Sequence, residues 1–136
     1  MPFVLDASVA LSWYFGDEFS EYAAKVESRL RSDGAIAPSI WPLEMANGLL
    51  AAERRGRLSN ASLSHAARLL LSLPVIVVGV TTALALGSVL DVARQQELSS
   101  YDAAYLELAM REGLPLATLD DRLRAAAHSV GVTLVS

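Results

Sequence analysis

The sequence of 136 residues contains no cysteine and only two histidines. The absence of cysteine excludes a disulfide scaffold, thiolate-bound zinc, an iron–sulfur cluster and a cysteine nucleophile, and it is typical of a reducing compartment. We therefore predict a cytoplasmic protein. His65 and His128 are too few for a histidine-rich metal site, and we expect both at the surface or in packing. Any chemistry must depend on carboxylates or hydroxyls.

Positive charge is also scarce, with 11 Lys and Arg against 15 Asp and Glu and a formal net charge of −4. This balance excludes a surface built for indiscriminate binding of nucleic acid or membranes. Proline and glycine interrupt the longest uncharged run, residues 69–90, so we expect no membrane span. The N-terminus has no basic segment followed by a long apolar one, so we expect no signal peptide.

Length and composition predict one domain, residues 1–136, because 53% of the residues are hydrophobic and a single core suffices. Short apolar runs predict buried strands, and longer runs with helical periodicity predict helices between them. The expected strands are residues 3–5, 36–37, 75–78, 116–117 and 133–135. The expected helices are residues 20–32, 42–55, 60–73, 82–96, 101–111 and 121–129. Alternating strands and helices predict an α/β fold with a mostly parallel sheet covered on both faces.

Four acidic residues map to one edge of this predicted sheet. Asp6 and Asp120 directly follow strands, and Glu44 and Asp102 fall in the first turns of helices. In open parallel sheets the ligand crevice lies outside the carboxyl ends of the strands, where the following helices begin. The sequence therefore predicts that four carboxylates from distant parts of the chain lie near one another.

Each acid also has an ordinary explanation, because a carboxylate at a helix N-terminus stabilises the helix dipole by about 0.3 to 1 kcal/mol. Asp6 fits that explanation least, since it ends an all-apolar strand. If the acids converge, two charges about 4 Å apart repel by roughly 4 kcal/mol at an effective dielectric constant of 20, and a cation is needed. Oxygen ligands favour Mg²⁺ or Mn²⁺ over zinc or copper. The chemistry expected is metal-assisted attack of water on a phosphodiester, with one or two ions.

Four segments of the chain also match a family. They read VLDASVA at residues 4–10, WPLEMAN at 41–47, SYDAAY at 100–105 and LATLD at 116–120. These segments resemble those of PIN-domain ribonucleases, in particular the VapC toxins of type II toxin–antitoxin systems. The resemblance implies a three-layer α/β/α sandwich around a mostly parallel sheet of about five strands. It also implies an Mg²⁺- or Mn²⁺-dependent endoribonuclease that cleaves RNA and is neutralised by a cognate antitoxin protein. We separately expect a homodimer, although the sequence does not fix the oligomeric state.

Carried over by position, the family's catalytic and metal-binding acids fall on Asp6, Glu44, Asp102 and Asp120. In this interpretation Asp6, Asp102 and Asp120 hold the metal directly or through water, and Glu44 supports a ligand or orients the attacking water. Which acid acts as the base stays open. The possible supporting residues are Ser8, Asn47, Thr118 and Asp121, for which capping and packing are the alternative roles.

Two further groups leave a functional and a structural interpretation open. Arg54, Arg55 and Arg57 either contact RNA phosphates or complement the dipole at a helix end. Trp13, Tyr14 and Phe15 either form part of a partner-binding groove or pack into the core.

Two other functions are compatible with a single-domain α/β protein that has acids at its strand ends. A phosphoryl-accepting receiver needs a lysine after a late strand, whereas the only lysine, Lys25, lies in an early helix. An inactive binding module with the same fold differs from the enzyme only in lacking Mg²⁺-dependent RNA cleavage.

Overall fold

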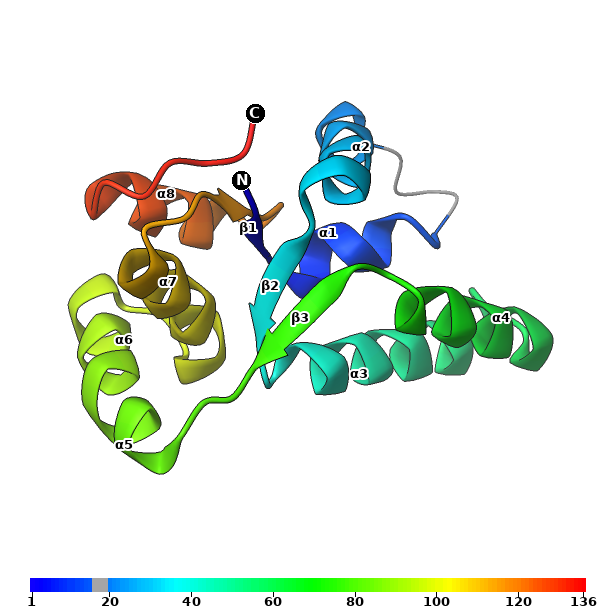
Figure 1. The fold of residues 1–136 in the computed structure, drawn as a ribbon. Helices are drawn as coiled ribbons and strands as arrows, with labels where there is room; N and C mark the ends of the chain where they lie inside the picture. The colour runs from blue at the N-terminus through cyan, green and yellow to red at the C-terminus, as the bar shows by residue number, and fades with distance from the viewer. Residues whose placement is uncertain (16–19) are drawn as a thin grey trace.

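In the part of the chain that the structure describes, four parallel strands form one sheet, which lies between two groups of helices (Figure 1). The computed structural model describes residues 1–15 and 20–136. The strands are β1 (Phe3–Leu5), β2 (Ala35–Pro38), β3 (Val75–Val78) and β4 (Leu116–Ala117), in the order β3-β2-β1-β4. Val4 pairs with Ile36 on one side and with Leu116 on the other, so β1 is an inner strand. The predicted parallel sheet is confirmed.

Helices cover both faces of this sheet. They are α1 (Ala7–Ser12), α2 (Glu21–Asp33), α3 (Trp41–Arg54), α4 (Asn60–Leu71), α5 (Thr82–Leu84), α6 (Leu90–Gln96), α7 (Ser100–Glu112) and α8 (Asp121–Ser129). Helices α1 to α4 lie on one face and α5 to α8 on the other, which confirms the three-layer arrangement (Figure 1). Among the described residues, no helix is both long enough and apolar enough to cross a membrane.

The structure differs from the sequence-based expectation at three elements. Helix α1 was not predicted, because six residues are too few to show helical periodicity. The predicted fifth strand at residues 133–135 is reduced to one parallel bridge between Leu116 and Leu134, because β4 offers only two residues to pair with. The predicted helix 82–96 follows one path but contains a wider, π-helical turn at Ala85–Val89.

The core lies on both faces of the sheet, and one part of it is the contact between β1 and helix α7. All three residues of β1 are buried, and Tyr105, Leu106 and Leu108 of α7 are at most 1% exposed. Helix α7 packs against both β1 and β2. Because Asp102 lies in the first turn of this helix, the packing that holds α7 on the sheet also determines where that carboxylate lies.

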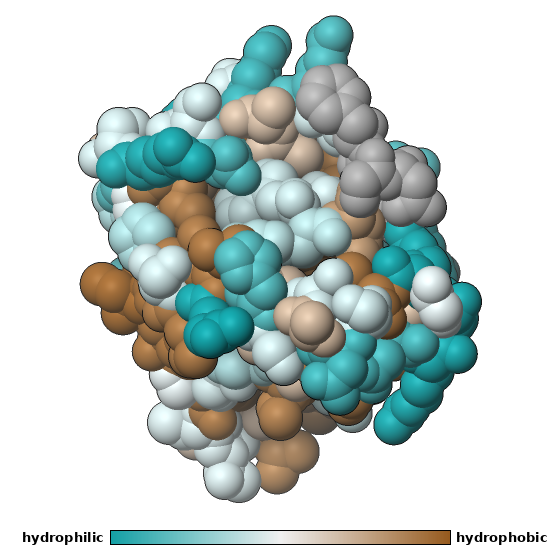
Figure 2. Space-filling model, turned by 90° about the vertical axis from the view of Figure 1, so that its right-hand side faces the viewer, coloured by the Kyte–Doolittle hydropathy of each residue, from teal (hydrophilic) through white to brown (hydrophobic). Residues whose placement is uncertain are grey.

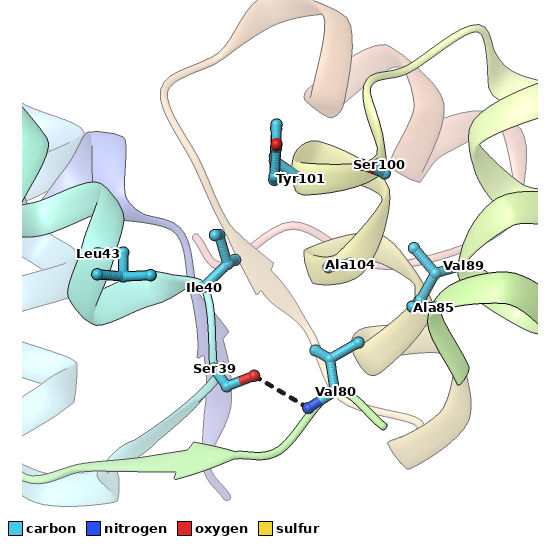
Figure 3. Close-up of a pocket in the computed structure, with 9 residues that line it drawn as sticks. All are labelled: Ser39, Ile40, Leu43, Val80, Ala85, Val89, Ser100, Tyr101 and Ala104. Atoms are coloured by element: carbon cyan, nitrogen blue, oxygen red, sulfur yellow. Dashed lines mark hydrogen bonds between the residues drawn. The ribbon is translucent and has the colours of Figure 1, made fainter. Parts of the chain in front are cut away.

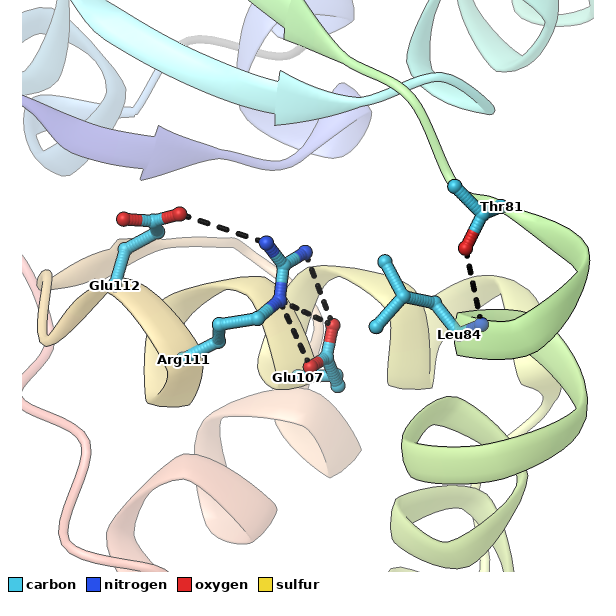
Figure 4. A network of polar contacts seen from close by, with 5 residues as sticks. All are labelled: Thr81, Leu84, Glu107, Arg111 and Glu112. Carbon is cyan, nitrogen blue, oxygen red and sulfur yellow. Dashed lines mark hydrogen bonds and ion pairs between the residues drawn. The ribbon is translucent and has the colours of Figure 1, made fainter.

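One acid of α7 is buried away from the predicted site and forms an ion pair. The Glu107 side chain is 8% exposed, and the Arg111 guanidinium donates to it, with Nε 3.1 Å from Oε2 (Figure 4). Arg111 also approaches Glu112 at 3.5 Å. In the same view Thr81 caps helix α5, its hydroxyl accepting the N–H of Leu84 at 3.1 Å. Glu107 therefore depends on one arginine for compensation of a nearly buried charge.

Replacing Arg111 by glutamine should destabilise the protein, because the Glu107 carboxylate would lose its charged partner. We expect a loss of about 1 to 3 kcal/mol in the free energy of unfolding, at the lower end because Arg111 is partly exposed. Urea denaturation measures it. The control is Arg31→Gln, which breaks the exposed pair with Glu27 and should cost at most about 0.5 kcal/mol. Equal losses of unfolding free energy in the two variants would show that the burial of Glu107 does not make its ion pair more important than an exposed one.

Candidate active site

The order of the strands creates a crevice beside β1. The chain runs from β1 to β2 and β3 and then returns to place β4 on the other side of β1. The connections leaving the adjacent strands β1 and β4 therefore run to opposite faces, and ligands of open α/β sheets bind at such a point. Asp6 follows β1 directly, and Asp120 lies three residues beyond β4 as the N-cap of α8.

Two hydroxyl groups hold the carboxylate of Asp6. The Ser8 hydroxyl and the Thr118 hydroxyl each donate to Oδ2 of Asp6 at 2.7 Å. Thr118 is completely buried and 112 positions away in the chain. The same two hydroxyls accept backbone N–H groups of Leu119 and Asp120, at 3.1 and 3.0 Å. The end of β1 is thus linked to the segment after β4, and Oδ2 of Asp6 is committed to the protein.

Two further acids are also held through one oxygen each. The hydroxyl of Tyr105 donates to Oε1 of Glu44. Oδ1 of Asp120 accepts the N–H of Leu123 at 2.9 Å, so the capping role considered for Asp120 occupies one of its oxygens. Asp102 lies one turn before Tyr105 on α7, where Ser99 caps the helix through the Asp102 N–H at 3.1 Å. In each of these carboxylates, the second oxygen is therefore the one that can bind a ligand.

The acids repel one another and are partly removed from water. Burial raises the pKa of Asp6 above its ordinary value, and the charge of Asp102 raises it further, against the hydrogen bonds from Ser8 and Thr118. Burial also raises the pKa of Glu44, with repulsion from Asp6 and Asp102 added and the Tyr105 hydrogen bond opposing. The pKa of Asp102 is raised by burial and then by the charge of Asp120. The four predicted acids therefore form one electrostatically coupled group.

The donor set of this group suits a hard divalent cation. All four side chains offer carboxylate oxygens, and neither histidine is part of the group, as both are exposed. Within residues 1–15 and 20–136, no three acids or histidines are arranged to hold an ion between them. Mg²⁺ usually binds through one or two carboxylates and keeps several waters, so acids that couple at a distance fit this class of ion.

The remaining predicted residues are spread more widely. Asn47 is exposed one turn beyond Glu44 on α3, and Asp121 is exposed at the start of α8. Arg54 lies at the other end of α3, about 15 Å from Glu44 at a rise of 1.5 Å per residue. The structure thus places Ser8 and Thr118 at the acids and the arginine cluster away from them.

Two residues near the acids were not singled out from the sequence. Tyr105 lies three positions after Asp102, a spacing that puts both on one side of α7 and could have indicated it. Arg122 is exposed in the first turn of α8, and its charge lowers the pKa of Asp102. Its guanidinium also donates to the Glu97 carbonyl oxygen at 3.3 Å. A cation is unfavourable at a helix N-terminus, so the nearby acids account for its position.

Asp6→Asn should flatten the pH dependence of stability of the metal-free protein. A carboxyl group whose pKa is raised on folding stabilises the fold below its unfolded pKa of about 4, and this contribution is lost as the pH rises through the folded pKa. In chelator, the free energy of unfolding of the parent should therefore fall relative to that of Asp6→Asn as the pH rises above about 4. Chemical denaturation at a series of pH values measures this difference.

The matched control for this experiment is Asp91→Asn, which removes one charge from the exposed side of α6. Its pH profile should follow that of the parent. Identical profiles for Asp6→Asn and Asp91→Asn would contradict the electrostatic description of the site.

Comparison with known proteins identifies the family. Residues 3–129 match the sequence profile of the PIN domain. The chain is 34% identical over 115 residues to ribonuclease VapC3 of Mycobacterium tuberculosis, a match that covers 82% of this chain and 81% of that protein.

Two solved structures are similar in fold. The crystal structure of PAE2754 from Pyrobaculum aerophilum superposes with a TM-score of 0.72 at 26% identity, over 93% of this chain and 79% of that one. VapC20 of Mycobacterium tuberculosis, a toxin that cleaves the sarcin–ricin loop, superposes with a TM-score of 0.63 at 19% identity, over 91% of this chain and 94% of that one. Together with the sequence matches, these findings show that the chain belongs to the PIN domain family and is a relative of the VapC ribonucleases.

Proposed function

We propose that this protein is the toxin of a type II toxin–antitoxin system, a single-domain cytoplasmic endoribonuclease that requires Mg²⁺ or Mn²⁺. The observation that carries the proposal is the coupling of four carboxylates at the carboxyl edge of the sheet in a PIN-domain chain. The substrate is RNA, by relation to a protein named ribonuclease VapC3. Mutual repulsion of these carboxylates explains why a cation would bind there.

In this proposal Asp6, Asp102 and Asp120 hold the metal directly or through water, and Glu44 supports a ligand or orients the attacking water. A bound divalent ion lowers the pKa of water and stabilises charge on phosphate oxygens. The contribution of the chain is orientation. Ser8 and Thr118 occupy one oxygen of Asp6, and the N-cap contact occupies one oxygen of Asp120, so the second oxygen of each can face the ion.

We also propose a groove for the antitoxin. A pocket of about 410 Å³ is lined by Tyr14, Leu58, Ala61, Ser62, His65 and Ala66. The face that carries α4 has apolar surface open between polar side chains (Figure 2). Of the three aromatic residues expected at a partner groove, only Tyr14 lines this pocket. Phe15 is buried, with the Arg57 guanidinium 4.7 Å from its ring centroid, and the Trp13 indole donates to the Ala23 carbonyl oxygen at 2.9 Å. Trp13 and Phe15 therefore serve mainly to pack α1.

A second copy of the chain is the proposed partner for another apolar surface. A pocket of about 280 Å³ opens between the first turn of α3 and the first turn of α7, with Ile40, Leu43 and Tyr101 at its sides (Figure 3). Leu43 is 68% exposed, and Leu86 in the wider turn before α6 is 70% exposed. Exposed apolar side chains of this size are typical of interfaces, which supports the expected homodimer.

The proposed activity predicts metal-dependent cleavage that requires Asp6. Total cellular RNA incubated with the purified protein should acquire discrete new ends in Mg²⁺ and none in chelator. Saturating Mn²⁺ should also raise the free energy of unfolding, by about 2.7 kcal/mol at a hundredfold excess over Kd. Asp6→Asn should lose cleavage and most of the gain from Mn²⁺, yet melt no lower than the parent in chelator, because one repelling charge is removed.

Asp91→Asn is the control here too and should keep both responses. A parent protein that leaves RNA intact in Mg²⁺ would support the inactive binding module. Loss of the metal response in Asp91→Asn but not in Asp6→Asn would show that the site has been placed wrongly.

The arginine cluster gives a prediction about RNA binding. Replacement of Arg54, Arg55 and Arg57 by glutamine should weaken RNA binding and flatten its salt dependence, by about 0.7 in the log–log slope for each lost phosphate contact. The measurement uses the Asp6→Asn background, so that RNA is bound but not cleaved. Arg122→Gln, beside the acids, tests one phosphate contact at the site, and Arg31→Gln on α2 is the control. If the salt dependence of RNA binding is unchanged in the triple variant, these arginines do not contact RNA phosphates, and their role is structural.

A further inference from the structure

The tyrosine beneath the acids makes a contact that packing alone does not explain. Tyr105 is completely buried, yet its hydroxyl donates to Oε1 of Glu44, which comes from another helix 61 positions away in the chain. Its phenol also lies close enough to Asp6 for that charge to act on it. Tyr105 therefore touches the proposed metal site from the core side.

Buried tyrosine hydroxyls usually find a hydrogen-bond partner, and a backbone carbonyl oxygen would serve as one. Here the partner is a half-buried carboxylate of α3, at the helix N-terminus nearest the sheet edge. The contact orders a flexible glutamate, whose side chain loses rotamer entropy when it is fixed. An acid that is already fixed before a ligand arrives does not have to lose this entropy on binding.

We propose that Tyr105 is the positioning residue for Glu44: its hydroxyl occupies Oε1 and thereby turns the other carboxylate oxygen toward the metal site. This inference rests on the proposed function. Asp6 is held in the same way, because Ser8 and Thr118 both donate to one of its oxygens and leave the other for a ligand. Glu44 supports a metal ligand or orients the attacking water, so its position acts on the metal through that ligand or water. Groups that orient metal ligands commonly change metal affinity or activity by about 10- to 100-fold when they are removed.

The test is Tyr105→Phe, which removes one hydroxyl and keeps the ring in the core. The dissociation constant for Mn²⁺ alone, measured calorimetrically without RNA, should rise about 10-fold. RNA cleavage should fall at limiting Mn²⁺ and recover when Mn²⁺ is in excess. The matched control is Tyr22→Phe, because Tyr22 lies under the Arg124 guanidinium, 4.8 Å from it, and no described contact joins its hydroxyl to a carboxylate. Tyr22→Phe should leave the Mn²⁺ affinity unchanged.

A double-mutant cycle separates positioning from a structural role. If Tyr105 acts through Glu44, adding Tyr105→Phe to Glu44→Gln should weaken Mn²⁺ binding little further, because coupled residues are not additive. A structural role would instead lower the melting temperature in chelator, leave the Mn²⁺ dissociation constant of Tyr105→Phe unchanged and act equally in both backgrounds. That result would overturn the proposal.

Measurements on the parent protein distinguish a failure of the Tyr105 role from a failure of the proposed function. A parent protein that binds Mn²⁺ and cleaves RNA, with Tyr105→Phe of equal affinity, overturns only the role of Tyr105. A parent protein that does neither overturns the proposed function and this role with it. If Tyr105→Phe does not fold, Glu44→Asp replaces it, since it keeps the charge but withdraws the carboxylate from the hydroxyl by one methylene. Mn²⁺ affinity equal to the parent in Glu44→Asp would overturn the proposal.

Discussion

The buried carboxylate of Asp6 is the constraint on which the arrangement around it depends. It lies at the end of an inner strand where burial raises its pKa, and two hydroxyls are needed to hold it there. One of these, Thr118, reaches Asp6 only because β4 pairs directly with β1. The pairing of β1 with β4 is therefore what allows the charge of Asp6 to be held in a buried position. Loss of either the pairing or this buried charge would remove the contacts by which Ser8 and Thr118 hold the segment that leads to Asp120.

Several carboxylates of the site are fixed in position by hydrogen bonds although they repel one another. Asp6, Glu44 and Asp120 each have one oxygen engaged by a hydroxyl or a backbone N–H. Each engagement restricts the rotation of the carboxylate, and the hydroxyl contacts of Asp6 and Glu44 also oppose the rise in pKa that burial causes. The repulsion among the acids is not removed, and it adds to the effect of burial in raising the pKa values of Glu44 and Asp102. A rigid group of repelling acids is suited to a small, hard cation that needs little rearrangement of its ligands.

The surfaces around the site divide by charge and polarity. Arg122 is a positively charged residue near the acids, whereas Arg54 and Arg55 lie at the far end of α3. Arg57 is turned onto the ring of Phe15, so part of its role is to cover an aromatic residue of the core. The apolar pocket between α3 and α7 borders the acids, because Leu43 and Tyr101 in its lining directly precede Glu44 and Asp102, whereas the pocket beside α4 is lined by other elements. A partner in the first pocket would therefore border the proposed RNA site, and a partner in the second would not.

The sequence by itself determined the order of elements and the position of each acid at a strand end or in a first helical turn, because these depend on local periodicity and capping. It could not show α1, which is too short for a period, or the reduction of the last strand to a bridge at Leu134. Tertiary structure alone decided the partners of the acids. The contacts of Thr118 with Asp6 and of Tyr105 with Glu44 join residues 112 and 61 positions apart, and no local pattern encodes such a distance. They arise because β4 returns beside β1 and α7 packs across β1 and β2.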